Sequence, residues 1–488
     1  MPNTSHGCRS CRPPSPPKYV PLDVLTSILL YSFDSAEIPA PKPGIIPAPW
    51  SLSQVCSSWR GFVLGEPRFW RRISFNGSNR VISVLNEVLK RSGKLELDFQ
   101  ASDVFFPKKG DMVAKVILPL AKSGRLRYLS LNITPQRMKG FLSLPVGSLG
   151  ALAEVALTTD KFEKMRPEDI HVFDNAKGLR KITFETDGYE TSLFPSFPLP
   201  LNWPWPQLTS LNFRTLYMNV QVAHEIFNLC PNLREVYVLL DDDGTDRETV
   251  EPERLATLPD HPPSSIPLPN LRTIAVEKSN GLPTEFLRPL DCPRLEQFDF
   301  RFREQRPDEW SPTKLVDLLA RSTALKSVKV TFPGEIDIGL LGGDLPILTD
   351  IQASKGILSE SAIESMARGE LLPKLRFLSC TVVHDHLNAM INVLKVRWSQ
   401  GAKQESNGVL GMRSTIIRVM GSDWQFKKEI SRKICDIQKD LGVKGAVEVE
   451  LCHGPKVANQ DPVAGTDEDD ELDDKPVVEG VFVGKSSC

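Results

Sequence analysis

Apolar side chains along the middle of the chain follow one short pattern that returns many times. A leucine is followed, after two variable residues, by an apolar residue, one variable residue and a second apolar residue, as in Leu126, Leu129 and Leu131. The first residues of the ten copies are Leu126, Leu152, Leu179, Leu208, Leu233, Leu271, Leu295, Leu325, Leu348 and Leu375. Alternation of apolar and variable positions predicts a short strand in each copy.

Successive copies start about 23 to 38 residues apart, and most of these spacings are shorter than 30 residues. A period of this length around such a core is typical of leucine-rich repeats, in which each unit contributes one strand and one helix or irregular return. We therefore predict an α/β fold, an irregular leucine-rich-repeat solenoid with a parallel sheet, over residues 76–457. The longest spacing contains an acidic and then proline-rich stretch between Leu233 and Leu271, which we expect to form a surface loop.

The pattern changes after Leu375. Apolar spacing predicts helices at 384–397 and 423–441, and strands near 416–419 and 447–451. We interpret this region as a C-terminal cap, because an open solenoid has to cover its last apolar face.

Two apolar helical segments separated by a proline-rich insert precede the solenoid. The residues at helical spacing are Leu22, Leu25, Ile28 and Leu29 in the first segment, and Leu52, Val55, Cys56, Trp59, Phe62 and Val63 in the second. A helix from Val81 to Arg91, capped by Asn79, and a strand at 95–99 follow. Because two such short helices are not stable alone, they need the next domain or a partner to cover them.

Residues 21–75 resemble an F-box. The resemblance rests on Pro-Leu-Asp from Pro21, on Val-Cys-x-x-Trp-Arg from Val55 to Arg60, and on Pro-x-x-Trp from Pro67 to Trp70. It is closest in kind to the F-box-like proteins abundant in mushroom-forming fungi, where an APW-type segment, here 48–50, often precedes the second helix. The insert EIPAPKPGIIPAP is longer and richer in proline than the usual F-box linker.

The resemblance implies a small helical F-box-like N-terminal domain, at 19–75, that docks on the Skp adaptor of a cullin–RING ubiquitin ligase. The residues that it places in the adaptor interface are Pro21, Leu22, Leu25, Ile28, Leu29, Val55, Cys56, Trp59 and Arg60.

The amino-acid composition indicates which class of protein the chain belongs to. The 488 residues are 41% hydrophobic and 25% charged, with a net charge of −2, so no overall field favours nucleic acid. Nine scattered cysteines form no paired framework, which suggests a reducing compartment. We expect an intracellular protein, cytoplasmic or nuclear, without a secretory signal or membrane span. Residues 1–18 and the acidic tail, 458–488, are expected to be disordered.

Candidate chemistry is sparse. His384-Asp385-His386 is the best metal-like cluster, and Cys8-x-x-Cys11 beside His6 has the spacing of half a zinc site. A solvated loop and a tail with stray cysteines are the simpler readings. GVFVGKS near the C-terminus lacks the spacing and the helix of a phosphate-binding loop. The acidic run at 467–474 reads as a solvated tail more readily than as a partner or calcium site. We predict no enzyme, metal or cofactor.

Function is therefore expected in binding. The variable residues of each strand face away from the core, on the concave side of the solenoid. The candidates for target binding are Tyr128, Lys181, Asn212, Tyr237, Asp299, Lys329 and Phe377. These features predict a substrate-recognition subunit of a Skp–cullin–F-box ligase, without nucleic-acid or membrane partners. The alternative is a repeat-based interaction module in which the F-box-like helices serve only as a cap.

Overall fold

The structure is a computed structural model of the full chain. It describes residues 21–34, 51–76, 81–102, 116–160, 170–186, 203–240, 265–278, 286–302, 313–331, 336–342, 345–382, 384–402, 412, 414–420, 424–441 and 446–452. The predicted disordered ends, the proline-rich insert before the second helix, most of the acidic and proline-rich stretch between Leu233 and Leu271, the Cys8/Cys11 pair, the GVFVGKS segment and the predicted cap Asn79 lie outside these residues.

One curved, parallel sheet organises the described part of the chain, and its fifteen strands there follow each other almost in sequence order. The strands are β1 (Arg72–Asn76), β2 (Leu97–Ser102), β3 (Leu126–Asn132), β4 (Glu154–Thr159), β5 (Lys181–Thr186), β6 (Ser210–Met218), β7 (Glu235–Leu240), β9 (Thr273–Lys278), β11 (Gln297–Phe302), β12 (Ser327–Thr331), β13 (Ile336–Asp337), β14 (Asp350–Ile357), β15 (Phe377–Val382), β16 (Ser414–Met420) and β17 (Ala446–Cys452). Strand β13 pairs only with the edge of β14, and β8 (Ile266–Pro267) and β10 (Leu290–Asp291) form a separate short sheet.

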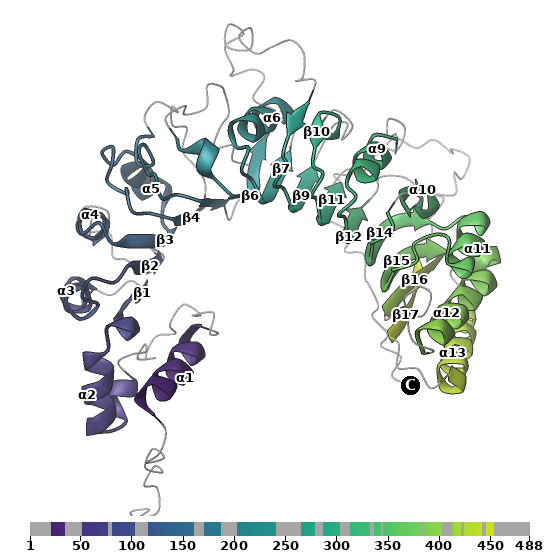
Figure 1. The fold of residues 1–488 in the computed structure, drawn as a ribbon, viewed down its shortest axis with the longest axis horizontal. Coiled ribbons are helices and arrows are strands. Elements are labelled where there is room, and N and C mark those ends of the chain that lie inside the picture. Colours follow the sequence, from purple (N-terminus) through teal and green to yellow (C-terminus); the bar gives the residue numbers. More distant parts are fainter. Residues whose placement is uncertain are drawn as a thin grey trace, which may run out of the picture.

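The sheet lines the inner side of an open arc, and helices lie along its outer side (Figure 1). The helices that precede the solenoid strands are α1 (Leu22–Asp34), η1 (Leu52–Gln54), α2 (Ser57–Gly65) and η2 (Pro67–Trp70). Those of the solenoid are α3 (Val81–Arg91), α4 (Leu118–Lys122), α5 (Pro135–Leu142), η6 (Trp205–Gln207), α6 (Val220–Leu229), α9 (Thr313–Arg321), α10 (Ile338–Gly342), α11 (Glu360–Arg368), η9 (His384–His386), α12 (Leu387–Ala402) and α13 (Trp424–Leu441).

Local sequence explains where these helices begin and end. The Asn219 side chain accepts a hydrogen bond from the Val222 amide at 2.8 Å and so caps α6. Ser359 caps α11 in the same way, and Gly369 ends that helix in the left-handed region, with φ of 78°. A side chain with a Cβ would be strained at this φ, so glycine suits the position.

The core lies between the sheet and the outer helices. The repeated leucines that start each copy are buried, and they precede the strands except for Leu126, which is the first residue of β3. Inside the strands, the buried residues of neighbouring units stand in register: Leu129 pairs with Val155, and Val155 with Ile182. Aromatic side chains extend the same stack, since the rings of Phe184 and Phe213 lie parallel at 5.6 Å.

The predicted α/β class and parallel sheet are confirmed, and all ten copies of the repeat form adjacent strands. Two differences concern the ends. Strand β1 was not expected, yet it pairs in parallel with β2. The predicted C-terminal strands and helices exist as well, but β16 and β17 continue the same sheet in parallel. This region therefore extends the solenoid by two units.

The cysteines partly differ from expectation. Cys56, Cys230, Cys292 and Cys380 are free thiols, whereas Cys435 in α13 is disulfide-bonded. Burial raises the pKa of the Cys292 and Cys380 thiols to about 12, so these two stay protonated and unreactive. None of the helices in the described residues is both long and apolar enough to cross a membrane.

A buried threonine interrupts the apolar ladder at β16 and gives a stability prediction. Thr415 stands in register between Leu378 and Val447, and its hydroxyl has no hydrogen-bond partner among the described residues. An unpaired buried hydroxyl is destabilising, so Thr415→Val should raise the free energy of unfolding by about 1 kcal/mol in denaturant titration. Thr381→Val is the matched control: it removes a hydroxyl that donates to the Ser354 carbonyl at 3.3 Å, and should destabilise. Loss of stability in both variants would contradict this reading of Thr415.

The buried His224 gives a pH prediction. Its Nε2 donates to the Phe286 carbonyl at 3.0 Å, and burial lowers its pKa below the ordinary 6.5. As pH falls below about 6.5, the unfolded chain takes up a proton that the folded chain does not, so stability is lost. Denaturant titration from pH 7.5 to 5.5 should show this loss in the wild type and a smaller loss in His224→Gln. Equal slopes in the two proteins would contradict the assignment.

Candidate protein-interaction sites

Hydrogen bonds within residues 51–76 break the second predicted helix in two. The Cys56 thiol accepts from the Trp59 amide at 3.5 Å and caps α2, so η1 ends just before it. The Arg60 Nε then donates to the Ser53 carbonyl at 3.0 Å and ties α2 back to η1. Sequence spacing alone suggested one continuous helix, because apolar residues continue through the break.

Trp70 joins this helical part to the solenoid. It is buried, its indole N–H donates to the Val63 carbonyl at 2.8 Å, and the Arg91 guanidinium of α3 lies 5.2 Å from its ring. Leu29 and Leu30 of α1, with Leu52 and Phe62, pack against the same core from the N-terminal side. The N-terminal helices thus cover the first apolar face of the solenoid.

The opposite face of α1 is apolar as well. Val24, Ile28 and Tyr31 follow each other at four- and three-residue spacing, so they line one side of the helix. They are exposed, Ile28 to 53% and Tyr31 to 75%. With Val55, also exposed, they make up four of the seven exposed large apolar side chains in the described residues. We call Val24, Ile28 and Tyr31 the α1 stripe.

The residues predicted for the adaptor interface divide into three groups. Ile28 and Val55 are exposed, as are Pro21 and Arg60, although Arg60 also bonds to Ser53. Leu25, Leu29, Cys56 and Trp59 are half-buried, with Leu29 packed on the core and Cys56 serving as a cap. Leu22 lies in α1, and its side chain is outside the described part.

Val24 and Tyr31 were not anticipated. Their spacing with Ile28 is visible in the sequence, but α1 is apolar on nearly every side. A helix of that kind has no unique inward face until its neighbours are known.

The sheet lies on the inner side of the arc (Figure 1), and in each strand the residues that alternate with the buried ones face away from the core. Register brings four of the predicted target-binding residues into one row across consecutive strands: Asn212 pairs with Tyr237, and Asp299 with Lys329, with Ala275 between the two pairs. Tyr128 and Lys181 belong to a neighbouring row and flank Glu154. Phe377 lies farther along, on β15.

A shallow hollow that is open to solvent and has room for about one water molecule lies beside Ala275 in this row. Its lining residues are Arg214, Val238, Ala275, Val276, Glu277, Asp299 and Arg301. Arg301 forms two hydrogen bonds to Asp299, at 3.1 and 2.8 Å, which raise the pKa of its guanidinium. The Arg214 guanidinium stands 5.2 Å from the ring of Tyr237. Leucine spacing in the sequence carries no signal for this hollow.

Side chains able to hold a metal do not gather: the described residues contain no group of three or more His, Cys, Asp or Glu placed for one. The ring of His386, in the predicted metal-like cluster, faces the Leu358 carbonyl at 3.4 Å.

Comparison with known proteins gives no family: neither a protein-family model nor a curated protein sequence matches the chain.

The exposed and the core-facing side of α1 should differ in how much stability an aspartate substitution costs. Ile28→Asp should change the free energy of unfolding by no more than about 1 kcal/mol, because its side chain stays in water. Leu29→Asp should cost about 2 kcal/mol or more, because it places a carboxylate against the core. Denaturant titration of both variants measures this difference. Equal destabilisation by the two substitutions would show that the α1 stripe is buried.

Proposed function

We propose that the chain is an F-box-like substrate receptor: residues 21–75 dock on a Skp-type adaptor, and through it on a cullin scaffold, while the concave sheet face holds a target protein. The one observation that carries the proposal is the α1 stripe together with Val55. The helices already cover the solenoid with their inner face, so capping does not account for a second apolar face on α1. Contiguous exposed apolar side chains mark interaction sites.

The chemistry of the stripe fits a protein partner. Three apolar residues spaced over two turns of one helix are the anchors by which an amphipathic helix binds an apolar groove. Tyr31 adds a hydroxyl beside a large apolar ring, a combination enriched in interface hot spots. Together with the F-box-like motifs in this segment, the stripe points to an adaptor rather than to a small molecule.

The solenoid would supply the second half of the function. Its concave face carries a mixed row of Asn212, Tyr237, Asp299 and Lys329 beside the hollow at Ala275. A rigid curved surface of this kind suits protein recognition. Catalysis would then consist of holding the target near the ligase's charged enzyme, with no residue of this chain in the chemistry.

The test is co-expression with a Skp adaptor, followed by size-exclusion chromatography. The wild type should elute as a 1:1 complex, and Val24→Asp/Ile28→Asp should lose the adaptor, because two carboxylates would be buried without partners. Exposed positions are chosen so that the variant keeps its fold, which circular dichroism checks.

Leu340→Asp is the matched control. Leu340 in α10 is likewise an exposed aliphatic residue, remote in sequence from α1, and the variant should still bind the adaptor. A wild type that elutes alone and folded would overturn adaptor docking and leave the helices as a cap on an interaction module.

A further inference from the structure

A row of mostly basic residues runs along one rim of the solenoid, where the strands begin. Each position of the row directly follows the leucine that starts a repeat, from Leu179 to Leu375. Five of the eight residues are cations and one is an anion: Arg180, Thr209, Arg234, Arg272, Glu296, Lys326, Thr349 and Arg376. We call these eight positions the basic ridge.

Backbone hydrogen bonds hold the basic ridge in one line. The Arg180 carbonyl accepts from the Thr209 amide at 2.8 Å, and the Thr209 carbonyl accepts from the Arg234 amide at the same distance. The same bond joins every later pair of neighbours, up to Arg376. Because neighbouring strands lie about 4.8 Å apart, the part of the ridge from Arg234 to Arg376 spans about 24 Å.

The cations of the ridge are accessible to solvent. Arg180, Arg234, Arg272 and Lys326 are exposed, and Arg376 is half-buried. The side chains of Arg234 and Arg376 form no hydrogen bond or ion pair in the described part of the chain. Both guanidinium groups can therefore bind a ligand without breaking a contact of the fold.

Carboxylates lower the charge of the ridge without cancelling it. Glu296 lies 2.6 Å from the Lys326 Nζ and 3.6 Å from the Arg272 guanidinium, yet these two cations stay 55% and 60% exposed. Glu235 and Asp350 border the ridge, each directly after one of its positions. With both of them counted, the cations still outnumber the anions.

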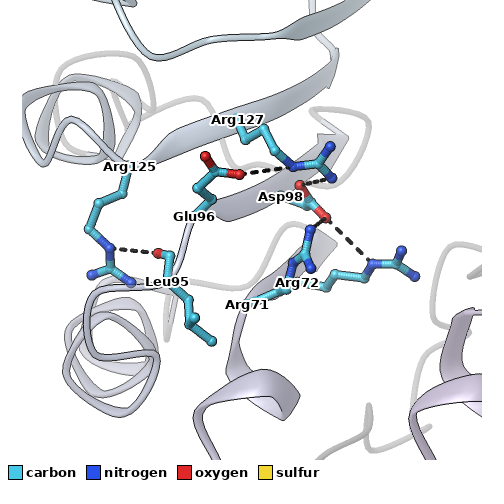
Figure 2. A network of polar contacts seen from close by, with 7 residues as sticks. All are labelled: Arg71, Arg72, Leu95, Glu96, Asp98, Arg125 and Arg127. Atoms are coloured by element: carbon cyan, nitrogen blue, oxygen red, sulfur yellow. Dashed lines mark hydrogen bonds and ion pairs between the residues drawn. The ribbon is translucent and has the colours of Figure 1, made fainter. Parts of the chain in front are cut away.

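Arginines at the N-terminal end of the solenoid serve the fold instead (Figure 2). Arg127, which follows the first repeated leucine, approaches Asp98 at 2.7 Å, and Arg125 donates to the Leu95 carbonyl at 2.8 Å. The next unit has Ala153 at the same position. The basic ridge therefore begins at β5.

The anion that complements this ridge occurs in the same chain. Residues 467–474 read DEDDELDD, with seven carboxylates among eight residues. Without these carboxylates the net charge of −2 would be +5. We propose that this acidic run binds the basic ridge of its own chain.

The length of the chain permits this contact. Fourteen residues separate Cys452, the end of β17, from the acidic run, and a chain of that length spans at most about 46 Å. Arg376 precedes β15, two strands from β17 and at the opposite end of the parallel strands, about 25 Å from Cys452. Eight extended residues cover about 26 Å, close to the span from Arg376 to Arg234. A tether of suitable length also raises the local concentration of its ligand to about the millimolar range.

A protein segment fits this ridge better than a nucleic acid. Glu296, Glu235 and Asp350 would repel a continuous phosphate backbone. None of the eight ridge positions is aromatic, so the ridge has no ring on which bases could stack.

The ridge borders the candidate target-binding residues, because Lys181 directly follows Arg180. A bound acidic run would restrict the access of a target to that rim of the sheet. Only this consequence rests on the proposed function, since binding of the run does not involve the adaptor.

The test is fluorescence anisotropy of a labelled synthetic peptide with the sequence of residues 463–478, added to the full chain. A tail-neutral variant of the full chain carries Asp467→Asn, Glu468→Gln, Asp469→Asn, Asp470→Asn, Glu471→Gln, Asp473→Asn and Asp474→Asn. The tethered run occupies the ridge in the wild type, so the tail-neutral variant should bind the peptide at least about tenfold more tightly, and less so at high ionic strength.

Two double variants, each added to the tail-neutral variant, locate the binding site. Arg234→Gln/Arg376→Gln should remove most of the peptide binding, and circular dichroism checks that the fold is kept. Lys122→Gln/Lys139→Gln is the matched control: it removes two exposed positive charges from the outer helices α4 and α5 and should have no effect. In the wild type, carbodiimide cross-linking should join the acidic run to the Lys326 amine.

Equal peptide affinity of the wild type and the tail-neutral variant, or no effect of Arg234→Gln/Arg376→Gln, would overturn the inference. Tighter binding of a single-stranded DNA oligonucleotide than of the peptide would also overturn it. A dimer that light scattering detects in the wild type but not in the tail-neutral variant would assign the run to a second copy instead. Adaptor binding, measured in parallel, should be the same in both proteins, and its absence would refute the proposed function alone.

Discussion

Burial of one apolar ladder between neighbouring strands is the constraint on which the structure depends. Each unit contributes a short strand and a few buried side chains, such as Leu129 and Leu131 in β3, and cannot cover them alone. The next unit covers them, because parallel strands in register bring Val155 and Leu157 to the same level. Stability is therefore shared between neighbours, and an end of the sheet without a neighbour would expose the ladder.

This constraint decides which residues form the core and which surfaces are left for binding partners. At the N-terminal end, Trp70, Leu29 and Leu30 belong to the core, which leaves the α1 stripe for a partner. Along the arc, the inner face of the sheet contributes nothing to the ladder, so its residues can vary without loss of the fold. The hollow at Ala275 lies on that face. The proposed adaptor site and the candidate target-binding row thus lie on surfaces that the core does not use.

The sequence predicted those parts of the fold that recur with a regular spacing along the chain. The ten strands and the α/β class followed from leucine spacing, because each buried ladder position recurs at a fixed place in its unit. Strand β1 was missed because Arg72–Asn76, although Ile73 and Phe75 alternate with polar residues, lacks the leading leucine of the repeat, and β16 and β17 were taken for a cap because their units lack the leucine motif as well. The α1 stripe was not predicted because α1 is apolar on several sides, so its sequence does not show which side faces the core.

Hydrogen–deuterium exchange of the full chain, with and without a Skp adaptor, tests the central proposal most directly because it reports where the partner binds. Docking on the α1 stripe predicts slower exchange in peptides that cover 22–34 and 51–65 on addition of the adaptor, with the strands of the concave face unchanged. Unchanged exchange in those N-terminal peptides, or protection confined to the concave face, would contradict the assignment of these helices as the adaptor-binding element.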